Sequence, residues 1–358
     1  MYKFRNHLNH LSNDSYAHQV VGPNTLDCSL GTNPYGFSKK VLHGAQRIDY
    51  NLINSYPSVD DRLKSQIIQF WEKAITLKED QIELACGSMD CITKINKIFI
   101  DVGTPVLGYV PQFPDYEADV KSLGGIYESV KMHEDHGRFN TSLFLDHLHQ
   151  KYALAYIDNP NNPTGQVIPI EDIETIALKS ADLGICLVVD EAYGDFMDMS
   201  HSAINLLDRF DNLIVLRSFS KGFGLAGLRV GYTVSSPEIM SFYKKVHIPF
   251  AVNFLSGCLV EEALKDENFI QSSRKQVEAA KTILIQKIKT LDHLETHAQT
   301  PIITLVHGDP TVDLYAALLK QQVISVPGSS FVGLGSHCVR VRIPSDVNLL
   351  IDKINRLP

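Results

Sequence analysis

One lysine of the chain stands where it could bind a cofactor covalently. Lys221 lies in the segment SFSKGFGLAGLRVGY (218–232), directly after the apolar run NLIVLR (212–217), which predicts a strand. A lysine amine can condense with an aldehyde, and it becomes useful when other groups hold the rest of the aldehyde-bearing molecule. The groups that hold the rest of that molecule would have to come from other parts of the chain.

The glycines that follow this lysine allow a different interpretation. Gly222, Gly224 and Gly227 have the G-x-G-x-x-G spacing of a dinucleotide-binding turn. That turn requires a helix after its last glycine and an acidic residue about 20 positions further on. Here only Leu228 separates Gly227 from RVGYTV (229–234), which predicts another strand. The spacing therefore disfavours a dinucleotide.

Three polar groups follow other predicted strands. The segment NPNNPTG (159–165) presents Asn162 after an apolar run, and VVDEAY (188–193) places Asp190 and then Tyr193 at the end of a buried strand. An unpaired buried aspartate is costly, so we expect a cationic partner for it. The carboxyl ends of parallel strands meet at one edge of a sheet, where open α/β sheets bind their ligands.

An anion site is predicted at the same edge. The turn CGSMD (86–90) leads from a strand pattern into a helix pattern, so the backbone N–H groups of Ser88 and Met89 would face an anion. Arg229, after the glycines, adds a second cation near Lys221. The predicted site therefore combines an amine, an acid, an amide, a phenol and an anion cradle. This set suits pyridoxal 5'-phosphate (PLP): the lysine would bind its aldehyde, and the aspartate would pair with its ring nitrogen.

The elements that would position these groups alternate between strand and helix patterns from about residue 55. Short apolar runs recur between amphipathic segments, such as the helix predicted at 170–183, and this favours a largely parallel sheet with helices on both faces. We expect this large domain to span residues 46–250.

The pattern changes after about residue 250. A long helical stretch at 254–291, a helix at 311–320, two strand patterns and a last helix opened by Asp346 predict a smaller α+β lobe. We expect residues 251–358 to form this small domain together with residues 1–45.

Composition disfavours several classes of partner. The 358 residues carry a net charge of −8 at pH 7, which argues against nucleic acid. Neither a secretory signal nor an apolar run of membrane-spanning length is visible, so we expect a cytoplasmic protein with no membrane partner.

The six cysteines form no C-x-x-C pair and are expected to be buried and reduced. HEDHG (133–137) is expected to be a loop and not a metal site.

Taken in order, the motifs resemble those of the class I and II aminotransferases, PLP enzymes of fold type I, over nearly the whole chain. The histidinol-phosphate aminotransferases are the group that it resembles most. The resemblance implies an α/β fold in which helices enclose a mostly parallel seven-stranded sheet, plus a smaller α+β domain. It is carried by GTNPYGFS, NSYPSVDD, NPNNPTG, DEAY, SFSKGFGLAGLRVGY, PFAVN and PGSSFVGLGSHCVRVRI.

The resemblance also implies a role for each residue around the cofactor ring. Lys221 would form the Schiff base and carry the proton, and Asp190 would hold the proton of the ring nitrogen. Asn162 and Tyr193 would hydrogen-bond the ring oxygen, and Phe113 would stack on the ring.

Further roles concern the phosphate, the substrate and a second subunit. Tyr56 would reach the phosphate of the neighbouring subunit's cofactor, which implies a homodimer. Arg340 would grip the substrate's carboxylate or phosphate, with Asn33 and Tyr35 nearby. We expect Arg342 to face the opposite side of the strand from Arg340. The cofactor phosphate would be bound by Ser88, Met89, Ser218, Ser220 and Arg229.

Two activities remain open at this point. The runs GTNP, GSMD and RIPSD depart from the family's usual patterns, and they leave the amino donor undetermined. We favour an aminotransferase of amino-acid biosynthesis that uses a small amino donor and a 2-oxo acid acceptor. The alternative is a decarboxylase that resembles threonine-phosphate decarboxylase. A PLP-binding transcription regulator is disfavoured because only about 30 residues precede GTNPYG and the chain is acidic.

Overall fold

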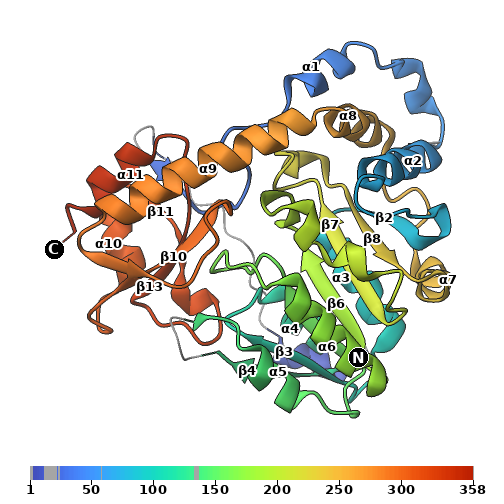
Figure 1. The fold of residues 1–358 in the computed structure, drawn as a ribbon, viewed down its shortest axis with the longest axis horizontal. Helices are drawn as coiled ribbons and strands as arrows, with labels where there is room; N and C mark the ends of the chain where they lie inside the picture. Colours follow the sequence, from blue (N-terminus) through green and yellow to red (C-terminus); the bar gives the residue numbers. More distant parts are fainter. Residues whose placement is uncertain (1–2, 12–21, 23–24, 58, 133–136, 358) are drawn as a thin grey trace.

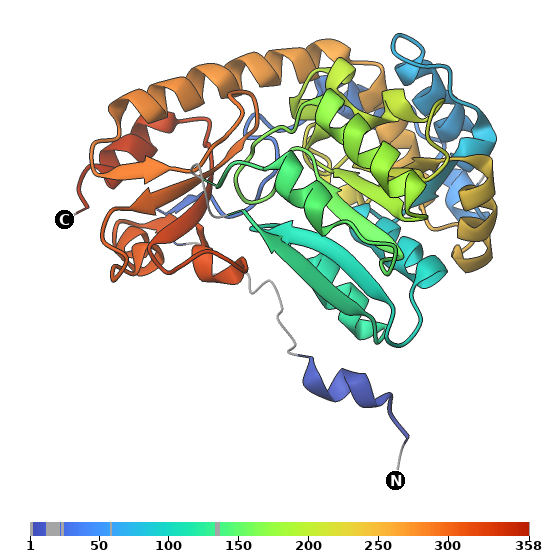
Figure 2. The same ribbon diagram turned by 60° about the horizontal axis from the view of Figure 1, so that its bottom comes forward.

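The chain folds into two lobes spanned by one long helix in a computed structural model, which describes residues 3–11, 22, 25–57, 59–132 and 137–357 (Figure 1). The larger lobe is built on a seven-stranded sheet and the smaller on a four-stranded one. Helix α9 (Glu267–Lys287) runs along both lobes (Figure 2). The predicted fold class is confirmed, and the predicted domain boundaries stay a prediction.

The large sheet has the strand order β2-β8-β7-β6-β5-β3-β4. It is parallel except for β8, which runs antiparallel to both of its neighbours. All residues of β5, β6 and β7 are buried, as expected for strands covered on both faces. The strands are β2 (Ile82–Ala85), β3 (Pro105–Val110), β4 (Ile126–Lys131), β5 (Leu154–Asp158), β6 (Cys186–Glu191), β7 (Leu213–Ser218) and β8 (Gly231–Ser235).

Helices pack on both faces of this sheet and form two apolar cores with it. One core includes side chains from α2 (Val59–Trp71), α5 (Thr141–His147) and α6 (Ile170–Asp182). The other includes side chains from α3 (Ser88–Phe99), α4 (Asp115–Ser122) and α7 (Pro237–Val246). Val188 belongs to this second core, so Asp190, two residues further along β6, faces the same helices.

The smaller sheet is antiparallel and has the order β12-β13-β10-β9. Beside it, β1 pairs in parallel with β11 and so ties residues near the N-terminus to this lobe. Its elements are β1 (Leu26–Asp27), β9 (Leu291–His293), β10 (Ile302–His307), β11 (Val323–Ile324), β12 (Val326–Pro327), β13 (Cys338–Arg342), α10 (Leu314–Lys320) and α11 (Val347–Ile354).

Two helix predictions for this half of the chain need correction. The stretch 254–291 is divided into α8 (Phe254–Leu264) and α9, because Asp266 takes non-helical backbone angles and its carboxylate accepts a hydrogen bond from Ser38. The helix also ends earlier than predicted, at Lys287, and Leu291 begins β9. The helix expected from residue 311 begins at Leu314, because the side chain of Asp313 caps it by accepting a hydrogen bond from the backbone of Ala316.

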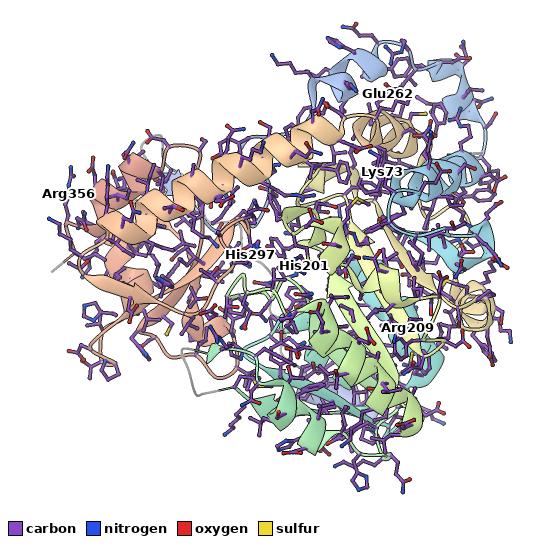
Figure 3. All side chains as sticks on the ribbon, viewed as in Figure 1. Lys73, His201, Arg209, Glu262, His297 and Arg356 are labelled. Atoms are coloured by element: carbon purple, nitrogen blue, oxygen red, sulfur yellow. The ribbon has the colours of Figure 1, made fainter. Side chains whose placement is uncertain are left out.

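A hydrogen-bonded seam joins the two lobes next to the NPNNPTG turn. The hydroxyl of Thr304 donates to the carbonyl of Pro163 at 3.0 Å, and that of Thr300 donates to the carbonyl of Gly165 at 2.7 Å. Next to the seam, the buried Lys281 Nζ lies within hydrogen-bond distance of four neutral oxygens of residues 296–302. His297 lies at the same junction (Figure 3). The turn is therefore held from both lobes.

A buried ion cluster fixes the ends of β6 and β7. Arg217 Nη1 lies 2.8 Å from the carboxylate of Glu191, and Nη2 pairs with Asp195. We expect Arg217→Met to lower the free energy of unfolding by about 3–5 kcal/mol, because two buried carboxylates lose their partner. Urea denaturation would measure this loss, and the exposed Arg209→Met is the control. A loss no greater than that of the control would contradict the prediction.

The remaining sequence expectations concern cysteines, membranes and metals. Cys86 is exposed and Cys258 is partly exposed, so the prediction of burial is wrong for these two and confirmed for the other four; all six are unpaired. Among the described residues, no helix is both long and apolar enough to cross a bilayer. HEDHG lies outside the described residues except for Gly137.

Candidate active site

The lysine loop lies at the carboxyl edge of the large sheet. Lys221 follows β7, and its Nζ is 5.4 Å from the ring centroid of Tyr193, which follows β6. After Gly227 the chain enters β8 at Gly231 with only the 3-10 turn η8 (Ala226–Leu228) before it. The glycines therefore lack the helix that a dinucleotide-binding turn needs.

The predicted anion cradle is assembled around Gly87. This residue has φ +78°, and a methyl group added to it would lie 2.5 Å from Arg229 Nη2. Arg229 Nη1 donates to the hydroxyl of Ser220 at 3.2 Å, and the hydroxyl of Ser218 accepts from the backbone of Ser220 at 3.1 Å. Helix α3 begins at Ser88, followed by Met89, and no side chain caps it. Two hydroxyls, an arginine and free N–H groups thus meet at one place, which fits a phosphate.

Asp190 is a buried carboxylate at the end of β6. Its Oδ2 accepts a hydrogen bond from the hydroxyl of Tyr116 at 2.6 Å, and its Oδ1 accepts one from the backbone of Ala192 at 2.8 Å. Burial raises the pKa of Asp190 to about 7, and the hydrogen bond from Tyr116 opposes that rise. Among the described residues no lysine or arginine pairs with it. A protonated ring nitrogen of PLP would supply the expected cation.

Asn162 is fixed by the carboxylate of Asp158, a residue that the sequence analysis missed. Asp158 Oδ2 accepts a hydrogen bond from the backbone of Asn162 at 3.0 Å, and Oδ1 accepts from the hydroxyl of Tyr109 at 2.6 Å. The side-chain oxygen of Asn162 accepts from Arg340 Nη1 at 2.9 Å. The structure thus brings Asn162 and Arg340 together across the lobes.

The two arginines of β13 face the same side, so the expectation of opposite sides is wrong. Side chains two positions apart in a strand share a face. Accordingly, Arg340 Nη2 donates to the carbonyl of Ser29, and Arg342 Nη2 donates to the carbonyl of Asp27, two residues earlier, at 2.6 Å. The Nε of each is buried without a hydrogen bond to a described residue. Of the two arginines only Arg340 contacts Asn162, so Arg340 remains the better candidate for binding a substrate.

The segment GTNPYG packs over the lysine loop. The backbone of Asn33 donates to the carbonyl of Lys221 at 3.1 Å, and its side-chain amide donates to Gly222 at 2.8 Å and to Ser273 at 3.0 Å. Tyr35 packs in a small apolar cluster with Tyr193. The Asn33 amide is committed to the protein, so this residue fastens the loop, and its contact with substrate stays a prediction.

Two aromatic residues complete the predicted set. Phe113 meets the ring of Tyr116 edge to face, with ring centroids 5.4 Å apart. Tyr56 is 81% exposed and stacks on Phe250, with ring centroids 4.8 Å apart. Tyr116 was not among the predicted site residues, although a buried tyrosine hydroxyl usually requires a partner.

Comparisons with known proteins agree with this geometry. Residues 24–354 match the family model "Aminotransferase class I and II". The chain is 31% identical over 316 residues to a histidinol-phosphate aminotransferase of Methanococcus maripaludis, covering 87% of this chain and 83% of that protein. It is 30% identical over 331 residues to a histidinol-phosphate aminotransferase of Carboxydothermus hydrogenoformans, covering 89% of each.

Solved structures share the fold at lower identity. The histidinol-phosphate aminotransferase of Clostridium acetobutylicum superposes with a TM-score of 0.83 at 22% identity, over 92% of this chain and 98% of that chain. The L-threonine-O-3-phosphate decarboxylase of Porphyromonas gingivalis gives a TM-score of 0.77 at 20% identity, over 92% of this chain and 98% of that chain. The fold alone therefore accommodates both candidate activities.

Proposed function

Because the chain belongs to the class I and II aminotransferase family and is a PLP-dependent aminotransferase, we propose how its own residues divide the work of the reaction. When bound, PLP withdraws electrons from the substrate's Cα, so that the proton on this carbon becomes acidic. Lys221 Nζ would hold the cofactor between turnovers, and as a free amine it would be the base that takes the Cα proton. Asp190 holds the proton of the ring nitrogen, and Arg229, Ser218 and Ser220 bind the phosphate.

The observation that carries this proposal is the arrangement at the carboxyl edge of the sheet. The Lys221 amine lies beside the Tyr193 ring, Asp190 is a buried carboxylate without a cation from the described chain, and the Gly87–Arg229 cradle is positioned for a phosphate. Tyr193 and Asn162 are the donors that we assign to the ring oxygen, and Phe113 is the ring that we assign to the cofactor's face.

A half-reaction screen tests the proposed substrate class, which is an amino acid or an amino-alcohol phosphate paired with a 2-oxo acid. Each amine is mixed with the PLP form in the absence of a 2-oxo acid, and the visible band of the cofactor is followed. The relatives' names make histidinol phosphate the first candidate, and threonine phosphate and aromatic amino acids follow. We expect loss of the band and release of a keto compound. Release of carbon dioxide without a keto product would favour the decarboxylase.

Arg340 is the residue that we assign to the anionic group of the substrate. It contacts Asn162, and its buried Nε donates to no described residue. We expect Arg340→Met to lower kcat/KM by about 10–100-fold, mainly through KM, since one or more charge-assisted hydrogen bonds are lost. Steady-state kinetics would measure this. Arg342→Met is the matched control, and a larger loss in that variant would transfer the role to Arg342.

We further propose a cytoplasmic homodimer in which Tyr56 serves the partner's site. Several large apolar side chains near Tyr56 are exposed, among them Ile53 and Ile248, and this supports an interface there. We expect the protein to sediment at twice the mass of one chain.

We also expect Tyr56→Phe to raise the Kd for PLP about tenfold, because one hydrogen bond to the cofactor phosphate is lost. Tyr50→Phe, on the same exposed segment, should leave Kd unchanged. Equal Kd values for Tyr56→Phe and wild type would contradict the assignment.

A further inference from the structure

Tyr116 contacts two residues that we assign to the cofactor ring. Its hydroxyl donates to Asp190 Oδ2 at 2.6 Å, and its ring meets Phe113 edge to face. Tyr116 lies in the first turn of α4 and is completely buried. A single side chain therefore touches both the acid expected at the ring nitrogen and the aromatic ring expected on the ring face.

A second tyrosine holds Tyr116 in place. The rings of Tyr116 and Tyr156 stack with centroids 4.8 Å apart and an interplanar angle of 19°. The hydroxyl of Tyr156 donates to Asn96 Oδ1 at 2.8 Å, and the amide of Asn96 donates to Asp119 Oδ2 at 2.7 Å. The Tyr116 ring is thus held by stacking on the Tyr156 ring, while the Tyr156 hydroxyl is bonded to Asn96 and not to Asp190.

The surroundings of Asp190 otherwise oppose its negative charge. Burial is the largest effect, and the neighbouring carboxylates of Asp158 on β5 and Glu191 on β6 add repulsion. Cys91 of α3 and Tyr156 of β5 also face this region and are neutral groups there, since burial raises the pKa of each. Hydrogen bonds to the charged form come from the Ala192 backbone and from Tyr116. Of the two, only Tyr116 can be changed without altering the main chain.

We propose that Tyr116 is a positioning residue that orients the Asp190 carboxylate and keeps it charged for the ring nitrogen of PLP. The inference rests on the proposed role of Asp190 in the same site. Tyr116 does not touch the reacting atoms; it acts through Asp190, and through the edge-to-face contact it also limits the tilt of Phe113.

Infrared titration of the full-length, cofactor-free chain tests this directly. The carbonyl band of the protonated Asp190 carboxyl is identified by its loss in Asp190→Asn, and its midpoint is followed with pH. We expect a wild-type midpoint near pH 7, raised by about one pH unit in Tyr116→Phe because a donor to the charged form is lost. Tyr156→Phe removes an equally buried hydroxyl of the same stacked pair and should leave the midpoint unchanged.

Two further measurements separate positioning from a merely structural role. Replacement of Tyr116 by 3-fluorotyrosine, a stronger donor of the same shape, should lower the midpoint, and this holds even if Tyr116→Phe fails to fold. In the holoenzyme, the Kd for PLP should rise about tenfold in Tyr116→Phe and stay constant in Tyr156→Phe. An unchanged midpoint in both Tyr116 variants, or equal shifts in the two Phe variants, would overturn the inference. Because neither readout uses turnover, the proposed function would survive that result if the wild type remains active.

Discussion

Lys221→Ala is expected to abolish transamination, with a loss of at least about 10⁴-fold in kcat. The variant loses both the covalent attachment of the cofactor and the group that moves the Cα proton, and proton transfer by a positioned side chain alone contributes about 10²–10⁴-fold. Lys221 is only partly buried and forms no ion pair among the described residues, so the fold should persist. The thermal midpoint would verify this, and single-turnover kinetics would measure the loss.

Two comparisons make this prediction specific. Lys320→Ala removes an exposed lysine at the end of α10 and should leave kcat unchanged. A small primary amine added to the Lys221→Ala protein should restore part of the rate, since it can accept the proton in place of the missing Nζ. Turnover within tenfold of wild type in Lys221→Ala, without added amine, would contradict the assignment.

Asp190→Asn is expected to lower kcat/KM by about 10²–10⁴-fold. The substitution keeps the shape and a hydrogen-bond acceptor for Tyr116 but removes the charge opposite the ring nitrogen, and the loss of one partner of a buried pair costs about 3–5 kcal/mol. Because the site would no longer favour a protonated ring, the chemical step should suffer more than substrate binding.

The control for this prediction retains the charge. Asp190→Glu keeps the carboxylate while displacing it by one methylene, so it should recover part of the activity that Asp190→Asn loses. Primary kinetic isotope effects on the Cα hydrogen would show whether proton transfer has become slower. A variant Asp190→Asn with kcat/KM near that of wild type would mean that this carboxylate does not pair with the ring nitrogen.

The sequence predicted the parts of the fold and site that depend on local patterns. The single residue between Gly227 and the next strand pattern left no space for a crossover helix, and β8 indeed begins at Gly231. Lys221 and Asp190 could be assigned to one edge because Asp190 lies at the end of one apolar strand and Lys221 follows another, and β6 and β7 are parallel neighbours. These inferences required no knowledge of side-chain packing.

The features that were missed depend on contacts between distant parts of the chain. The bond from Tyr116 to Asp190 joins residues 74 positions apart, and only the packing of α4 against β6 creates it. Asp266, at the break between α8 and α9, accepts a hydrogen bond from Ser38, which lies 228 positions away. The amine of Lys281 is satisfied entirely by neutral oxygens, so no charge pattern marks it. The prediction for Arg342 was wrong for a different reason. The two-residue period of a strand places Arg340 and Arg342 on the same face, so the sequence alone already contradicted opposite faces.

Chemical trapping tests whether Lys221 is the residue that holds the cofactor. The holoenzyme is reduced with sodium borohydride, which makes the bond between a lysine amine and the PLP aldehyde permanent, then digested and mapped by mass spectrometry. We expect the added mass of reduced PLP on the peptide that contains Lys221 and on no other lysine. Labelling of a different lysine, or no labelling of a protein that still binds PLP and turns over, would contradict the account.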